Sequence, residues 1–128
     1  MGTEYAGWQR QPGDRTVQQT IEDAFSTILR QGIEITGCGR TDTGVHARNY
    51  VAHTDLQLAD FGNEAISKLI YQLNSILPTD IAIHSLESVD SNFHARFDAK
   101  ERMYRYYVHF DKDPFLHNTS YYFPNRRE

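Results

Sequence analysis

Residues 37–48, Gly-Cys-Gly-Arg-Thr-Asp-Thr-Gly-Val-His-Ala-Arg, restrict the possible folds of this chain more than any other stretch. β-Prone runs lie on both sides of it, at residues 33–36 and 50–54. Its glycines permit tight turns and close approach of another backbone segment. The pattern therefore predicts a strand, a glycine-hinged loop and a second strand, with Arg40 and Asp42 presented at the centre of the loop. The alternative interpretation is an ordinary polar turn with a solvated ion pair.

Two amphipathic helices are predicted on either side of this unit. In residues 16–31, Thr16 and Gln19 form the pattern of a capping box, apolar residues recur at helical spacing, and Gly32 is the expected stop. Residues 63–76 repeat the helical spacing, with Asn63 as the expected cap and a proline two residues after the end. Both helices are expected to be structural.

Two further strands are predicted, at residues 81–86 and within 103–110. Hairpin-like and helical segments segregated in this way predict an α+β fold, an antiparallel or mixed β-sheet with helices packed on one face. Near the N-terminus, Tyr5 and Trp8 are interpreted as aromatics that cover an edge of the core, with direct ligand contact as the alternative. Residues 111–128, which contain two prolines, resemble a linker or the start of another unit.

Composition narrows the functional classes. The 128 residues, 39% hydrophobic and 23% charged, predict one globular domain with a real core. A net charge of −4 argues mildly against a nucleic-acid partner, although local patches matter more than the sum. Residues 96–105 contain four cations and two anions interleaved with aromatics. This pattern suits an RNA groove, with charge for phosphates and rings for bases, or a sheet whose arginines face water.

The cysteine and histidine content bears on redox setting and metals. Cys38 is the only cysteine, so a disulfide framework within this chain is excluded and a cytoplasmic location is expected. Cys38 is either a nucleophile or, as favoured here, a small residue at a strand end. Together with His46 and His53 it fits no zinc spacing, so no metal is expected and His46 is interpreted as a hydrogen-bonded strut. No apolar run reaches the roughly 18 to 20 residues of a membrane helix, and no membrane contact is expected.

Five short segments follow one another in a fixed order: YAGWQRQ at 5–11, GRTDTGVHA at 39–47, LN and LPTDI within 73–81, FHARF at 93–97 and RMYRY at 102–106. Together they resemble motifs of the N-terminal part of the bacterial-type tRNA pseudouridine synthase A family. The resemblance implies the pseudouridine synthase fold, of which this chain would form one ferredoxin-like (RRM-like) half. Two positions depart from the family pattern, since Thr43 stands where alanine is usual and Tyr50 where glutamine is frequent.

The resemblance also implies a reaction, the isomerisation of uridine to pseudouridine in the anticodon stem-loop of tRNA, at tRNA positions 38, 39 and 40. No cofactor is implied, and the expected assembly is a homodimer. Asp42 would be the catalytic carboxylate, acting either by attack on the sugar or by proton transfer. Tyr104 would stack on the extruded base, and Arg40 would contact phosphate or hold the vacated space. The candidate RNA-binding residues are Arg10, Arg48, Arg96, Lys100, Arg102 and Arg105.

The same resemblance gives an expected division of the chain. Residues 1–110 would form the N-terminal catalytic half, and residues 111–128 the start of a connection to a second half that this chain does not contain. Because the family also begins with a further strand, the chain is expected to be truncated at both ends. The alternative function is therefore a non-catalytic tRNA-binding module. A retaining glycosidase is disfavoured, because no second carboxylate shares the loop of Asp42.

Overall fold

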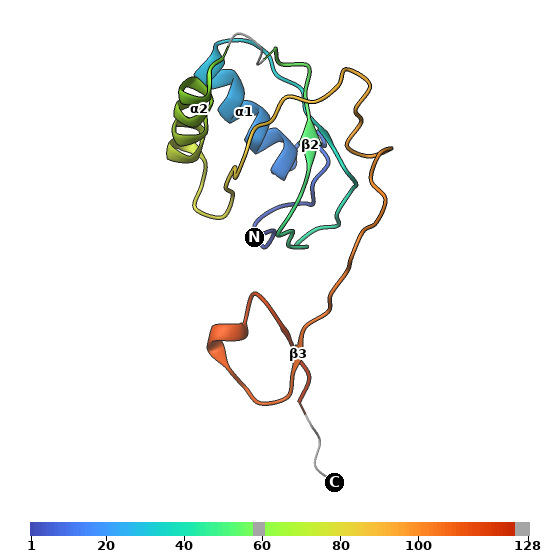
Figure 1. Cartoon of the computed structure of the whole chain (residues 1–128). Helices are drawn as coiled ribbons and strands as arrows, with labels where there is room; N and C mark the ends of the chain where they lie inside the picture. The colour runs from blue at the N-terminus through green and yellow to red at the C-terminus, as the bar shows by residue number, and fades with distance from the viewer. Residues whose placement is uncertain (58–60, 125–128) are drawn as a thin grey trace.

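A computed structural model describes residues 1–57 and 61–124. The fold is α+β, as predicted from the sequence (Figure 1). No helix in these two ranges is long and apolar enough to cross a membrane. The elements in chain order are α1 (Val17–Leu29), β1 (Thr36–Gly37), β2 (Ala52–His53), α2 (Asn63–Ile76), β3 (Val108–His109), the 3-10 turn η1 (Pro114–Leu116) and β4 (Tyr121–Tyr122).

Helix α1 begins where the sequence predicts. The buried Thr16 hydroxyl accepts a hydrogen bond from Gln19 N–H at 3.3 Å and caps the first turn. The capping box is only half formed, because the Gln19 amide donates to Asp23 Oδ1 instead of returning to Thr16. The predicted end was wrong: the helix stops at Leu29 rather than just before Gly32, and its C-cap Arg30 takes the left-handed conformation (φ 55°).

Helix α2 has the predicted bounds, but its cap differs. The N-cap is Gly62, without a side-chain hydrogen bond, rather than Asn63. At the other end Leu77 N–H donates to Leu73 O at 2.9 Å, and the following proline prevents continuation of the helix.

The core lies between the two helices and the segment that leads into β1. Trp8 from the N-terminal segment closes one edge of it, as expected from the sequence, and is 5% exposed. Tyr5 is buried as well. The buried cluster consists of Trp8, Ile21, Ala24, Phe25, Ile33, Ile35, Leu69, Leu73 and Leu77.

The strands are shorter than predicted and form two separate two-stranded sheets. β1 pairs with β2 in antiparallel register, with Thr36 opposite His53. Of the predicted run 103–110 only β3 is a strand, and it pairs in parallel with β4, with Val108 opposite Tyr121. The predicted strand at 81–86 is absent from the described chain. The Asn74 side chain accepts a hydrogen bond from Ile83 N–H at 2.8 Å and donates one to Ile83 O at 2.9 Å. These are the bonds that a neighbouring strand would otherwise make to Ile83.

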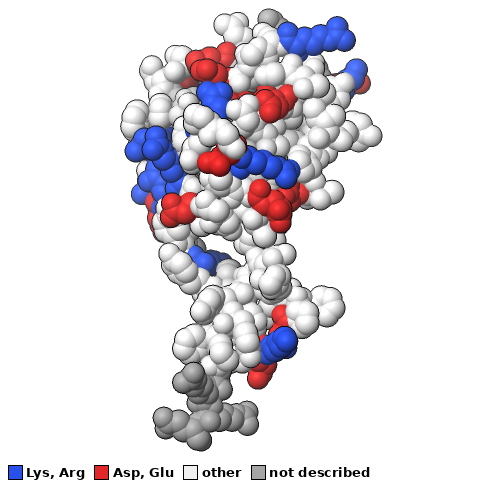
Figure 2. All heavy atoms as spheres, turned by 180° about the vertical axis from the view of Figure 1, so that it is seen from behind, with Lys and Arg blue, Asp and Glu red and all other residues white. Residues whose placement is uncertain are grey.

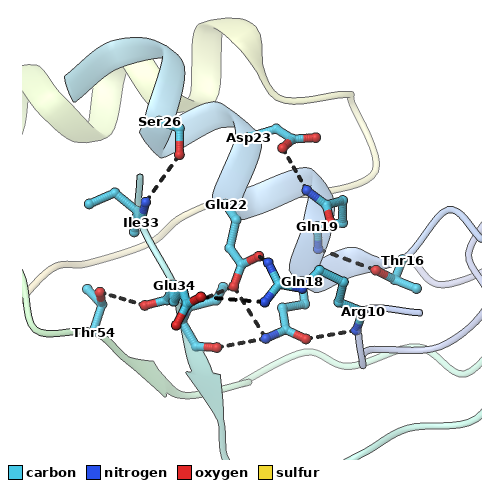
Figure 3. Close-up of polar contacts among 11 residues, drawn as sticks. Arg10, Thr16, Gln18, Gln19, Glu22, Asp23, Ser26, Ile33, Glu34 and Thr54 are labelled. Carbon is cyan, nitrogen blue, oxygen red and sulfur yellow. Dashed lines mark hydrogen bonds and ion pairs between the residues drawn. The ribbon is translucent and has the colours of Figure 1, made fainter. Parts of the chain in front are cut away.

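A buried polar network joins α1 to the segment before β1 (Figure 3). Gln18 Nε2 donates to Ile35 O at 2.8 Å, and Glu22 Oε1 accepts from Ile35 N–H at 3.0 Å. Two side chains one helical turn apart thus satisfy both backbone groups of one residue. The Arg10 guanidinium completes the network through an ion pair with Glu22 Oε2 at 2.8 Å.

The C-terminal part leaves the helices and extends away from them (Figure 1). The segment expected to be a linker contains η1 and β4, although its last four residues lie outside the described ranges. Many of its aromatic side chains are exposed, as are several just before it. The more exposed ones include Phe97, Tyr104, Tyr106, Phe110, Phe115, Tyr121 and Phe123.

Candidate active site

The glycine-rich loop lies between β1 and β2, as predicted, and the N-terminal segment holds it in place. Tyr5 O accepts a hydrogen bond from Gly44 N–H at 3.1 Å, and Trp8 N–H donates to Thr41 O at 3.3 Å. Gly7, with φ 84°, is required between them, because a β-carbon there would overlap Thr41 O. The YAGWQ segment is therefore a support for the loop, a function that its sequence alone did not reveal.

Asp42 begins a tight turn in the middle of this loop. Val45 N–H donates to Asp42 O at 3.1 Å, and Gly44 occupies the left-handed region with φ 80°. The side chains of Asp42 and Arg40 are both exposed. Among the described residues, neither side chain enters a salt bridge. A carboxylate on a braced turn is presented outward, where a substrate can reach it.

Tyr50 supports the base of the loop and was missed as a functional residue by sequence reasoning. Its hydroxyl donates to Gly39 O and lies 3.4 Å from Gly39 N–H. Its ring stacks on Trp8 with centroids 4.2 Å apart. Gly37 lies beneath both rings, where a β-carbon would collide with them. Burial raises the pKa of the Tyr50 phenol, so the proton that bonds Gly39 O is retained. The signal that could have identified Tyr50 is its departure from the family pattern.

Arg102 contacts the same base from a distant part of the chain. Its Nε and Nη2 donate to Cys38 O at 3.1 and 2.5 Å, and Nη2 also donates to Arg96 O at 3.1 Å. The structure thus brings the loop together with two residues of the predicted RNA-binding set. The sequence suggested a phosphate contact for Arg102, but the guanidinium here binds backbone carbonyls.

The FHARF motif forms a compact turn beside β2. Asp98 Oδ2 accepts from His94 N–H at 2.7 Å, and Asp98 N–H donates to His94 O at 2.9 Å. His53 of β2 accepts from Ala95 N–H through Nδ1 at 3.0 Å. Phe97 stacks on the His94 ring at 4.0 Å and is 77% exposed. The turn therefore presents an aromatic ring and the exposed Arg96 from a rigid backbone.

The other predicted site residues are exposed but less closely placed. Tyr104 is 65% exposed and follows Arg102 by two residues, in a stretch without helix or strand. Arg48, Lys100 and Arg105 are also exposed. Figure 2 shows Lys and Arg side chains lying among Asp and Glu on one face of the molecule rather than forming a continuous basic surface. The roles of these residues stay predictions.

Arg10 belongs to the network under α1 rather than to the loop (Figure 3). Besides its ion pair with Glu22, its Nη2 lies 3.8 Å from Glu34 Oε1. The contact of Arg10 with RNA stays a prediction, but its guanidinium already has a structural partner.

His46 is the strut that the sequence suggested. Its Nδ1 accepts from Gly2 N–H at 2.8 Å, so its Nε2 carries the proton that bonds Asn118 O. A second support lies nearby, where the Tyr5 hydroxyl donates to Asp80 Oδ1 at 2.7 Å. Burial and this carboxylate raise the pKa of Tyr5 to about 12. Across the two described ranges, no three His, Cys, Asp or Glu side chains are grouped to hold a metal ion.

The sequence model of the tRNA pseudouridine synthase family matches residues 1–98, which include the loop, its N-terminal support and the FHARF turn. The chain belongs to the tRNA pseudouridine synthase family. The family membership inferred from the five motifs is thereby confirmed.

Similar members of the family come from several bacteria. The chain is 51% identical over 115 residues to tRNA pseudouridine synthase A of Porphyromonas gingivalis, covering 90% of this chain and 45% of that protein. It is 44% identical to the protein of the same name from Parabacteroides distasonis, covering 98% of this chain and 48% of that one. For Aquifex aeolicus the identity is 42%, with 94% and 49% covered. The chain thus spans under half the length of these curated relatives.

Proposed function

We propose that this chain carries the catalytic carboxylate of a tRNA pseudouridine synthase, and that this carboxylate is Asp42. One observation supports this assignment above the others: Asp42 is exposed in a loop whose backbone, before and after Asp42, is hydrogen-bonded by Tyr5, Trp8 and Tyr50. A carboxylate placed in this way is available to act as nucleophile or base.

The reaction requires little beyond such a group. The N1–C1′ bond of uridine breaks, the uracil turns, and a C5–C1′ bond forms. The proton on C5 is lost to solvent and N1 gains one, so that substrate and product are isomers. Asp42 either attacks C1′ or accepts the C5 proton, and both roles fit an exposed carboxylate on a rigid turn.

Base recognition is assigned to the segment after the FHARF turn. The target base must leave its stack at a cost of a few kcal/mol, and an aromatic partner recovers about 1–3 kcal/mol. Tyr104, exposed and two residues beyond Arg102, is proposed as that partner. Arg40 is proposed to contact phosphate or the vacated space, while Arg48, Arg96, Lys100 and Arg105 supply phosphate contacts.

The motif resemblance supports three narrower proposals. The substrate is the anticodon stem-loop of tRNA, at tRNA positions 38 to 40, and the working assembly is a homodimer in the cytoplasm. Residues 1–110 form the catalytic half, and residues from 111 onward begin a connection to further sequence.

Tritium release from [5-³H]uridine in a tRNA transcript tests the proposal. The chain itself should release tritium, and Asp42→Asn should abolish release while leaving tRNA affinity within about twofold. Asp55→Asn, an exposed carboxylate just after β2, is the matched control and should keep full activity. Equal release by the wild type and Asp42→Asn would refute the role of Asp42. Tight tRNA binding with no release by the wild type would favour the alternative, a non-catalytic tRNA-binding module.

A further inference from the structure

Arg102 joins two parts of the site that are distant in sequence. Its guanidinium bonds the carbonyl of Cys38, which lies two residues before Arg40, and the carbonyl of Arg96 in the FHARF turn. Both acceptors are backbone atoms, so their positions follow the course of the chain rather than a side-chain rotamer. One planar side chain therefore fixes the entry to the loop relative to the turn.

The backbone around the loop entry is adapted to this contact. A β-carbon on Gly39 would lie 3.2 Å from Arg102 Nε, closer than side chains normally approach. Glycine thus allows the guanidinium to lie against the Cys38–Gly39 peptide. The two residues of this peptide have further bonds: the Tyr50 hydroxyl bonds Gly39, and Cys38 N–H donates to Val51 O at 2.9 Å.

Arginine suits this position and lysine does not. The fork of N–H donors reaches two carbonyls from one rigid plane, whereas an ammonium group is a flexible point charge. The geometry also separates Arg102 from the phosphate-binding set. The Nε–Nη2 edge of the guanidinium already donates to carbonyls at 2.5 to 3.1 Å, so a two-pronged contact of that edge with a phosphate would break these bonds.

From these contacts we infer that Arg102 is a positioning residue, not a phosphate contact: it holds the Asp42 loop and the Tyr104 segment in a fixed relation. The inference rests on the proposed function in one respect: that function gives Asp42 and Tyr104 their roles as the groups that Arg102 positions. Removing the guanidinium should displace Asp42 relative to Tyr104 without removing a phosphate contact. A displacement of about 1 Å in a catalytic constellation costs about 100-fold in rate.

The test compares Arg102→Gln with Arg105→Gln in the same chain. For Arg102→Gln, kcat for tritium release should fall by about 100-fold with KM unchanged. The slope of log affinity for tRNA against log salt should stay at the wild-type value, and exchange of the Cys38 amide proton, followed by NMR, should accelerate at least tenfold. For Arg105→Gln, the salt slope should fall in magnitude by about 1 with unchanged Cys38 exchange.

Chemical rescue adds a readout that general destabilisation would not move. In Arg102→Ala, millimolar guanidinium chloride should restore part of kcat, whereas the same concentration of ammonium chloride should not. If either Arg102 variant loses its circular dichroism signature, Arg102→Lys, which keeps the charge and one donor group, replaces it in the exchange and salt measurements. Unchanged Cys38 exchange, or a salt slope reduced by about 1, would overturn the inference. Because exchange and salt dependence need no turnover, an inactive wild type would refute the proposed function and still leave Arg102 tested.

Discussion

Glu22 should be among the most sensitive polar positions of this chain. It is 2% exposed and accepts hydrogen bonds from Ile35 N–H at 3.0 Å and Gln18 Nε2 at 3.3 Å, in addition to its ion pair with Arg10. In Glu22→Ala the buried Ile35 N–H loses its acceptor, at a cost of about 1–3 kcal/mol. Breaking a buried ion pair costs about 3–5 kcal/mol in total. The Arg10 side chain is 44% exposed and can be hydrated once its partner is removed. We therefore expect Glu22→Ala to lower the free energy of unfolding by about 3 kcal/mol, the low end of that range.

Urea unfolding followed by the fluorescence of Trp8, the only tryptophan, measures this loss. With a slope of about 1.5 kcal/mol per molar urea, the midpoint should fall by about 2 M. Glu34→Ala is the matched control, since Glu34 lies 3.8 Å from the same guanidinium but is 86% exposed, and it should change stability by less than about 0.5 kcal/mol. Glu22→Gln retains an acceptor for Ile35 N–H, so its urea midpoint should lie between those of Glu22→Ala and Glu34→Ala. Equal midpoints for Glu22→Ala and Glu34→Ala would refute the reasoning.

Two further predictions concern the core and the N-terminal support. Leu73 is fully buried between the helices, so Leu73→Ala should cost about 2–5 kcal/mol in the same urea assay, whereas Ile76→Ala, at a 47% exposed position one turn on, should cost under about 1 kcal/mol. Tyr5, whose pKa is raised to about 12 in the fold, contributes stability that is fully present below its ordinary pKa of about 10. That contribution should be lost as the pH rises from about 10 through about 12. Tyr5→Phe should lose this part of the alkaline dependence, and an unaltered pH profile would show that the hydroxyl does not carry it.

The helices were predictable because their determinants are local. Apolar spacing and the Thr16 cap predicted the start of α1, and apolar spacing with the proline after Leu77 predicted the extent of α2. The errors came from tertiary contacts. Residues 81–86 have strand composition, but the Asn74 side chain occupies the backbone groups of Ile83 that a neighbouring strand would need.

The site was predicted in part. The glycine-hinged position of Arg40 and Asp42 could be read from the sequence, because glycine spacing and flanking β-branched residues are local signals. The contacts of Tyr50 and Arg102 with the loop join residues 11 and 64 positions apart, and nothing in their immediate neighbours encodes such pairing. Arg10 shows the reverse case, since its charge suggested RNA while Glu22, one buried residue of α1, gives it a structural partner.

The two hydrogen bonds from α1 side chains to the Ile35 backbone also limit how the β-structure can grow. β1 faces β2 through residues such as Thr36 and Cys38, so the backbone groups of Ile35 point to the opposite edge. Gln18 and Glu22 occupy both of those groups. An incoming strand would find neither a donor nor an acceptor there, and a buried carboxylate would stand in its way. The helix thereby protects this edge from intermolecular strand addition, a common first step in aggregation.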